Sequence, residues 1–101
     1  MAKTHYAHPG GILKRLFLDE YHLSVSAAAT AMGFARSRLN DIVLERRDIT
    51  ADTALCLGKF FKNGAVFWLN LQTRYDLALA EAKAKAKLKK ITPFDEKTFR
   101  S

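Results

Sequence analysis

The segment FARSRLNDIVLERR, residues 34 to 47, holds the side chains of this sequence that are best suited to bind another molecule. Three aliphatic side chains in it have the spacing of a helix that buries one narrow stripe: Leu39, Ile42 and Val43. With these turned inward, helical geometry turns Arg36, Ser37 and Asn40 outward. Ala35 would lie exposed at the N-terminal end. Because arginine can donate to guanine and asparagine can pair with adenine or bind phosphate, the segment predicts a helix that faces a DNA groove.

Further arginines lie where contacts to the DNA backbone are expected: Arg38, Arg46 and Arg47. The guanidinium group matches the geometry of phosphate oxygens. The complete set of predicted DNA-binding residues is Ala35, Arg36, Ser37, Arg38, Asn40, Arg46 and Arg47. The alternative is a solvated helix face on which the arginines form ion pairs with nearby carboxylates: Asp41, Glu45 and Asp48. The elements around the segment favour the first interpretation.

A helix and a glycine turn are predicted directly before this segment. Ser24 can supply the N-cap oxygen of a short helix, VSAAATAM, and Gly33 follows where a residue with positive φ would turn the chain sharply. The small Ala29 falls where this helix would cross a next helix over residues 35–44. Other side chains are placed to form the shared core: Ala28, Met32, Phe34, Leu39 and Ile42. This pattern is typical of a helix-turn-helix, whose second helix enters the major groove.

The rest of the chain predicts three more helices. The first begins near Pro9 and is expected to bury Ile12, Leu13, Leu16, Phe17 and Tyr21. Thr50 caps a fourth helix over residues 51–62, which the Asn63-Gly64 pair ends. A fifth helix starts near residue 65 with an apolar stripe: Phe67, Trp68, Leu71, Tyr75 and Leu79. It then continues as a solvated, lysine-rich end.

These elements predict an all-α chain with one domain. Its five helices would occupy residues 9–91, between a flexible N-terminus over 1–8 and a C-terminal tail over 92–101. The aromatic side chains Phe60, Phe61, Trp68 and Tyr75 are interpreted as core rather than as a platform for stacking bases. Some of them could also contribute to a dimer interface.

The charge balance favours an acidic partner. Lys and Arg number 17 against 10 Asp and Glu, so the formal net charge is +7 and the pI is near 9.8. Five lysines gather near the C-terminal end: Lys83, Lys85, Lys87, Lys89 and Lys90. They are interpreted as a solvated helix end with at most a secondary phosphate contact. Non-specific binding to nucleic acid or an anionic surface is the alternative.

Other function classes find little support in the sequence. The single cysteine, Cys56, cannot form a disulfide framework, and no stretch approaches the ~18 apolar residues of a membrane span. We therefore expect a cytoplasmic protein without a membrane partner. The only histidines are His5, His8 and His22, and no paired carboxylates have useful spacing, so we expect no enzyme, metal or cofactor. A metal held by His5 and His8 is the weaker alternative.

Four segments together resemble a known family. They are HPGGIL at 8–13, LSVSAAATAMGFARSRLNDIV at 23–43, RRDITADTALCLGKFF at 46–61 and FWLNLQTRYDL at 67–77. The chain resembles the HigA-type antitoxins of the Xre group of helix-turn-helix proteins over residues 8–80. The motifs ITADTAL and FWLNLQ are more specific to that family than the helix-turn-helix, which very many repressors share.

The resemblance implies a five-helix, lambda-repressor-like fold and a homodimer that binds a palindromic operator in its own promoter. It also implies that the chain neutralises a RelE-like toxin, a ribosome-dependent mRNA endonuclease. The same seven DNA-binding positions carry over from it. Since such toxins are basic, Asp19 and Glu20 at the end of the first helix are the expected toxin-binding residues. A solitary Xre-type repressor without a toxin remains the alternative.

Overall fold

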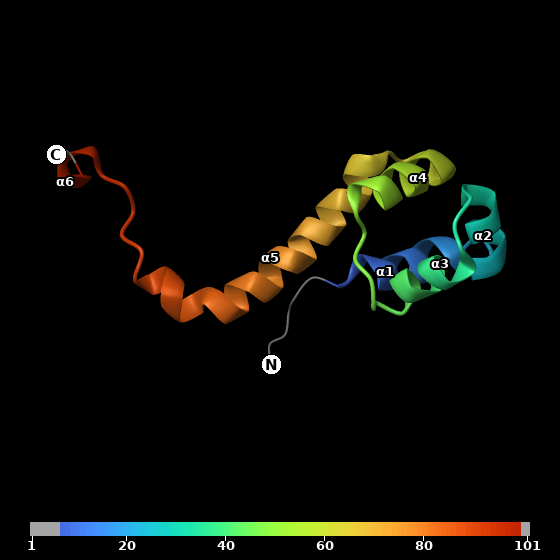
Figure 1. Cartoon of the computed structure of the whole chain (residues 1–101), viewed down its shortest axis with the longest axis horizontal. Coiled ribbons are helices and arrows are strands. Elements are labelled where there is room, and N and C mark those ends of the chain that lie inside the picture. The colour runs from blue at the N-terminus through green and yellow to red at the C-terminus, as the bar shows by residue number, and fades with distance from the viewer. Residues whose placement is uncertain (1–6, 100–101) are drawn as a thin grey trace.

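The computed structural model of the chain describes residues 7–99. Every regular element in this range is helical, so the predicted all-α class is confirmed (Figure 1). The elements are α1 Pro9–Ile12, the π-helical η1 Leu13–Leu18, α2 Val25–Met32, α3 Arg36–Val43, α4 Ala51–Phe61, α5 Ala65–Lys89 and α6 Glu96–Phe99. The five predicted helices correspond to α1 with η1, α2, α3, α4 and α5. The short α6 lies in the segment predicted as a tail.

The first helix starts as predicted but changes its pitch. His8 is the N-cap residue, and its Nδ1 accepts a hydrogen bond of 2.9 Å from the Gly10 backbone N–H. The chain then enters η1, where the Asp19 N–H bonds at 2.9 Å to the Lys14 carbonyl five residues earlier. Accordingly, the fully buried leucines of this element, Leu13 and Leu18, lie five residues apart.

The predicted buried stripe of this helix was therefore partly wrong. Leu16 and Tyr21 are both exposed, although the spacing of an ordinary α-helix placed them inward. A π turn takes more residues per turn, so each later side chain points in a different direction from the one that an α-helix predicts. Ile12 and Phe17 lie half-buried, and only Leu13 of the five predicted side chains is fully buried.

The helix-turn-helix closes through backbone and cap hydrogen bonds. The Ser24 Oγ accepts from the Ala27 N–H at 3.0 Å, which confirms the predicted cap of α2. Gly33 ends α2 with a φ of +76°, and the following Phe34 N–H bonds to the Ala29 carbonyl at 2.8 Å. This left-handed turn sends the chain sharply into α3, as the sequence predicts.

The pair α4 and α5 packs closely around two glycines. Thr50 caps α4 by accepting from the Thr53 N–H, as predicted. A Cβ atom added to Gly58 would lie only 2.3 Å from the carbonyl carbon of Gly64, so only a glycine fits on α4 where the chain enters α5. Gly64 has a φ of +85°. The chain thus reverses and lays the first part of α5 against α4.

The core lies between these helices around Trp68, which is fully buried. Its indole Nε1 donates to the Asn63 Oδ1 at 3.0 Å, and the Phe17 ring packs on it at a centroid distance of 4.9 Å. The other core members come from η1, α2, α3, α4 and the loop before α4: Leu13, Leu18, Ala28, Ala29, Leu39, Ile42, Ile49, Ala54 and Leu57. A single core thus fixes α3 relative to the other elements.

The predicted buried stripe of α5 needs correction. Trp68 and Gln72 are its buried residues, whereas Phe67 and Leu79 are exposed. A glutamine occupies a core position because its Oε1 accepts a 2.7 Å hydrogen bond from the Ile49 N–H. Its Nε2 donates to Asp76 at 2.9 Å, so both ends of the buried amide are paired. Leu71 and Tyr75 lie half-buried.

The distal part of α5 leaves the body and forms an arm (Figure 1). The radius of gyration is 18.0 Å and the principal extents are 59 × 32 × 20 Å, whereas a compact chain of this length has a radius of gyration of about 13 Å. The five lysines at its end are exposed, which agrees with the predicted solvated helix end. None of the helices described is both long and apolar enough to cross a bilayer.

Candidate nucleic-acid interface

One side of α3 packs into the hydrophobic core. Leu39 and Ile42 are fully buried, and Val43 is half-buried beside them. On the other side, Ala35, Arg36 and Ser37 are exposed at the N-terminal end of the helix, and Asn40 is half-buried one turn later. The short helix thus presents polar groups outward from a fixed apolar base. This is the arrangement that the spacing of the aliphatic residues predicts.

A backbone contact that the sequence analysis missed also fixes α3. A Cβ atom added to Gly10 would lie 1.7 Å from the carbonyl oxygen of Ile42, so α1 touches the backbone of α3 with no room for a side chain. The sequence does contain a signal for this contact, the glycine pair of HPGG at a helix start. Glycine destabilises a helix, so its presence there indicates a position without room for a side chain. Gly10 therefore helps to set the depth of α3 in the body.

Arg38 points toward α4. Its Nη2 donates to the Thr53 Oγ1 at 2.7 Å and to the Asp52 Oδ2 at 3.2 Å. Its guanidinium carbon lies 4.2 Å from the centre of the Phe34 ring. Arg38 was expected to contact the DNA backbone, and in the structure its guanidinium group lies in a network within the subunit.

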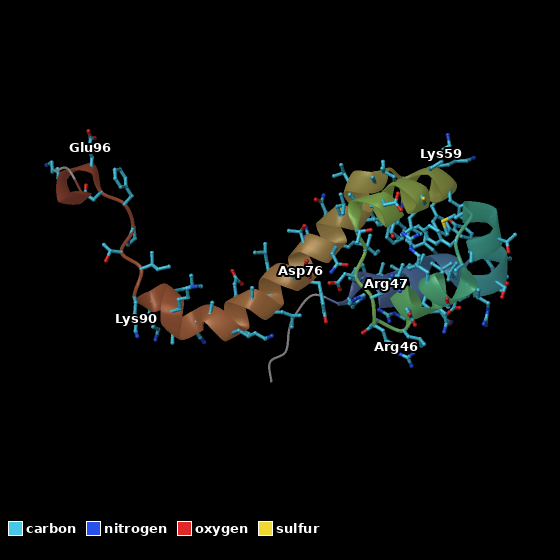
Figure 2. The ribbon with its side chains drawn as sticks, viewed as in Figure 1. Arg46, Arg47, Lys59, Asp76, Lys90 and Glu96 are labelled. Atoms are coloured by element: carbon cyan, nitrogen blue, oxygen red, sulfur yellow. The ribbon has the colours of Figure 1, made fainter. Side chains whose placement is uncertain are left out.

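Arg46 and Arg47 lie in the loop that follows α3, at the edge of the body (Figure 2). Glu45 bends this loop with a φ of +66°. Both arginines lie near the Asp41 carboxylate, at 3.8 and 3.9 Å, and their side chains are 68% and 52% exposed. Pairs this long and exposed contribute little, so both guanidinium groups are available to an anion.

The alternative of a fully ion-paired face is only partly realised. Asp41 does lie near two arginines, but Asp48 lies 3.4 Å from the Nε2 of His8, and that buried nitrogen has no other partner in the structure. Among the described residues, Arg36 has no ion pair with any carboxylate. The outward side of α3 therefore carries an uncompensated positive charge at its N-terminal end.

Comparison with known proteins agrees with this geometry. No protein-family model matches the chain. Virulence-associated protein I of Dichelobacter nodosus is 51% identical over 74 residues, which cover 73% of this chain and 68% of that protein. The Pseudomonas aeruginosa antitoxin HigA, solved with the higBA promoter, matches with a TM-score of 0.84 and 41% identity, over 90% of this chain and 100% of that one.

An addiction module antidote protein of the HigA family from Coxiella burnetii is equally similar. Its TM-score is 0.83 at 38% identity, and the match covers 90% of this chain and 100% of that one. The chain belongs to the HigA family of Xre-type helix-turn-helix antitoxins. The resemblance inferred from the four sequence motifs is thereby confirmed.

In this HigA-family chain the predicted acidic edge lies at the end of η1. Asp19 and Glu20 are both exposed, and the Asp19 Oδ1 accepts from the Lys14 Nζ at 2.6 Å. The exposed Leu16 and Tyr21 flank the pair in sequence. Because the π turn exposes these two apolar side chains, the acidic pair belongs to a mixed surface that the sequence analysis did not predict.

A metal site and the single cysteine are the other candidates for chemistry in this HigA-family chain. Residues 7–99 contain no cluster of His, Cys, Asp or Glu that could hold a metal ion. His5, half of the weaker metal alternative, lies outside the described residues. Cys56 is half-buried and lines an apolar groove of about 320 Å³ with Met32, Leu55 and Phe60. Its HigA-family relatives are named as antitoxins and transcriptional regulators.

Proposed function

We propose that the chain is the antitoxin of a type II toxin–antitoxin module and represses its own operon by binding operator DNA. The observation that carries this proposal is the outward side of α3, which is exposed, polar and positively charged on a helix held firmly from behind. The HigA relative solved with the higBA promoter supports it. Operator DNA lies in the bacterial cytoplasm, so the protein would act there.

Two groups of residues would make different contacts with DNA, one to base edges and the other to phosphates. Arg36 and Asn40 would read base edges in the major groove, with Ser37 and Ala35 at the same helix end making close contacts. Arg46 and Arg47 would bind phosphates beside the groove, where their exposed guanidinium groups exchange the long contacts to Asp41 for shorter ones. Base contacts would select the operator and phosphate contacts would set the affinity.

A palindromic operator requires a two-fold protein, and we propose a homodimer formed in part by α5. Val66, Leu77 and Leu88 recur every eleven residues, which is about three helical turns, so they share one face of α5. They are 68%, 56% and 48% exposed, on the face away from Trp68. Exposed apolar side chains on a helix that leaves the body support contact with a second copy.

We propose a RelE-like toxin as the protein partner, bound at the edge formed by Asp19 and Glu20. Exposed carboxylates attract a basic protein, and the neighbouring Leu16 and Tyr21 supply apolar area for a stable contact. The alternative is a solitary repressor, which fits the same DNA-binding surface. Relatives named as HTH-type transcriptional regulators favour this alternative equally.

One experiment tests both the proposed toxin partner and the proposed binding to promoter DNA. The reading frame next to the gene, expected directly upstream and coding for a basic protein, is expressed alone and then together with this chain. We expect growth arrest that co-expression relieves, and relief that is lost with Asp19→Lys and Glu20→Lys together. A neighbour that leaves growth unaffected, while the chain still shifts its own promoter DNA, would establish the solitary repressor instead.

A further inference from the structure

Arg38 is the one arginine of the helix-turn-helix segment that turns inward. Its side chain is only 30% exposed, compared with 68% for Arg46 and 52% for Arg47. It follows Arg36 and Ser37 on the same helix but lies next to the buried Leu39, on the side that faces the start of α4. The structure thus separates it from the groups that face outward.

The guanidinium group joins three parts of the fold. The two hydrogen bonds to α4 both start from Nη2, which has two hydrogens, so they occupy that nitrogen fully. The acceptor Thr53 is almost completely buried, and its Oγ1 also lies 3.3 Å from the Oγ1 of Thr50, the cap of α4. The Phe34 ring, in the turn before α3, stacks beneath the cation.

This link is important because α3 has few other contacts with α4. The backbone of α3 packs mainly on α1 and α2, while α4 packs on α2 and α5. Beyond the shared core, the hydrogen bonds of the Arg38 side chain are the direct link from α3 to the start of α4 among the described residues. A planar, forked and stacked guanidinium can make all these contacts at once, whereas a lysine ammonium cannot.

We propose that Arg38 is a positioning residue that locks the recognition helix α3 onto the N-terminal end of α4, rather than a phosphate contact. Its Nη2 is held by the Thr53 hydroxyl and the Asp52 carboxylate, so this nitrogen has no hydrogen left to donate to a phosphate. The lock sets the angle at which Arg36 and Asn40 meet the base edges. The inference rests on the proposed operator binding and assigns a role within it.

The test compares two variants on opposite sides of the lock. Arg38→Ala removes the donor, and Thr53→Val removes the acceptor with nearly the same shape and no change in charge. Affinity for the promoter DNA is measured by fluorescence anisotropy between about 50 and 200 mM salt. We expect each variant to bind about ten-fold more weakly, with the wild-type slope of log affinity against log salt, and the double variant to bind no worse than either single one.

Arg46→Ala is the matched control because it removes a predicted phosphate contact from the adjoining loop. Because the proposed dimer carries two copies of this arginine, its slope should fall by about 1.8. The proposal is overturned if Arg38→Ala flattens the slope in the same way while Thr53→Val binds like the wild type. It is equally overturned if both variants bind like the wild type.

A second variant keeps the test decisive if Arg38→Ala fails to fold. Arg38→Lys preserves the charge but cannot stack on Phe34 while bridging Asp52 and Thr53. A phosphate contact would tolerate lysine, whereas the lock predicts the same ten-fold loss as Thr53→Val. Absence of promoter binding by the wild type would instead overturn the proposed function, and the inference with it. The two failures are therefore distinguishable.

Discussion

Two arginines of the short helix α3 point in different directions, because the buried side of the helix fixes the orientation of each side chain. Arg36 lies exposed without an ion pair among the described contacts, whereas Arg38, two residues later, is held by Asp52, Thr53 and Phe34. The sequence predicted the outward position of Arg36 from the spacing of Leu39 and Ile42. It could not predict the hydrogen-bond partners of Arg38, because they come from α4, fourteen and fifteen residues away.

Arg36 and Asn40 should determine which operator is bound. Replacing either with alanine removes a predicted hydrogen bond to a base, so we expect a loss of about 1 to 3 kcal/mol in binding the native operator. Random DNA should bind almost as before, and the melting temperature should stay the same because Arg36 is exposed. Competition gel shifts with both DNAs measure this. An equal loss on the two would assign these side chains to phosphates.

Arg46 and Arg47 should instead act on all sequences alike. Changing both to alanine removes two predicted phosphate contacts from each subunit and four from the proposed dimer, so the slope of log affinity against log salt should fall by about 3.6. Asp41→Asn is the matched variant, since it removes the carboxylate that lies 3.8 and 3.9 Å from these arginines. It should strengthen binding at low salt. An unchanged slope in the double alanine variant would contradict the assignment.

At the scale of elements, the helix ends were predictable and the helix pitch was not. Ser24, Gly33 and Thr50 act through their own backbone neighbours, so local sequence determines their roles as caps and turn. The π turn of η1 is different, because Leu13 and Leu18 must both enter a core built by other helices. Burial of the polar Gln72 likewise depends on a distant partner, the Ile49 N–H.

The close contact between Gly10 of α1 and the Ile42 carbonyl of α3 predicts how a side chain at position 10 would change stability. Gly10→Ala would force the Ile42 carbonyl away from a Cβ atom that has no room, so we expect a loss of about 2 to 3 kcal/mol in the free energy of unfolding. Gly11→Ala is the control, because its Cβ would meet only the movable ends of Glu45 and Arg15. Chemical denaturation followed by circular dichroism measures both. Similar unfolding midpoints for the two variants would argue against the close contact.

At the scale of the whole molecule, the extended arm of α5 is the feature that bears on the proposed dimer. The arm of α5 makes the molecule 59 Å long, and an isolated helix of this kind gains little stability from its own contacts. The sequence predicted the solvated lysines. It did not indicate how far the helix would extend from the body, since that depends on where α4 and the core end (Figure 1).

The proposed dimer gives a prediction for the arm. Leu77→Asp combined with Leu88→Asp places charges on the face of α5 that carries these exposed leucines, so we expect a shift from dimer to monomer in sedimentation equilibrium at micromolar concentration. Operator affinity should fall with it, because two half-sites are no longer held together. Ala86→Asp, on the other side of the same helix, is the control and should leave the mass unchanged. A wild type with the mass of a monomer would refute the dimer.

The central claim, that the outward side of α3 enters the major groove, is tested most directly by methylation interference on the promoter DNA. Methyl groups on guanine N7 project into the major groove, whereas those on adenine N3 project into the minor groove. We predict that guanine N7 methylation blocks binding at two clusters about one helical turn, ~34 Å, apart, and that one contact in each disappears in Arg36→Ala. Tight binding that no N7 methylation disturbs would contradict the account.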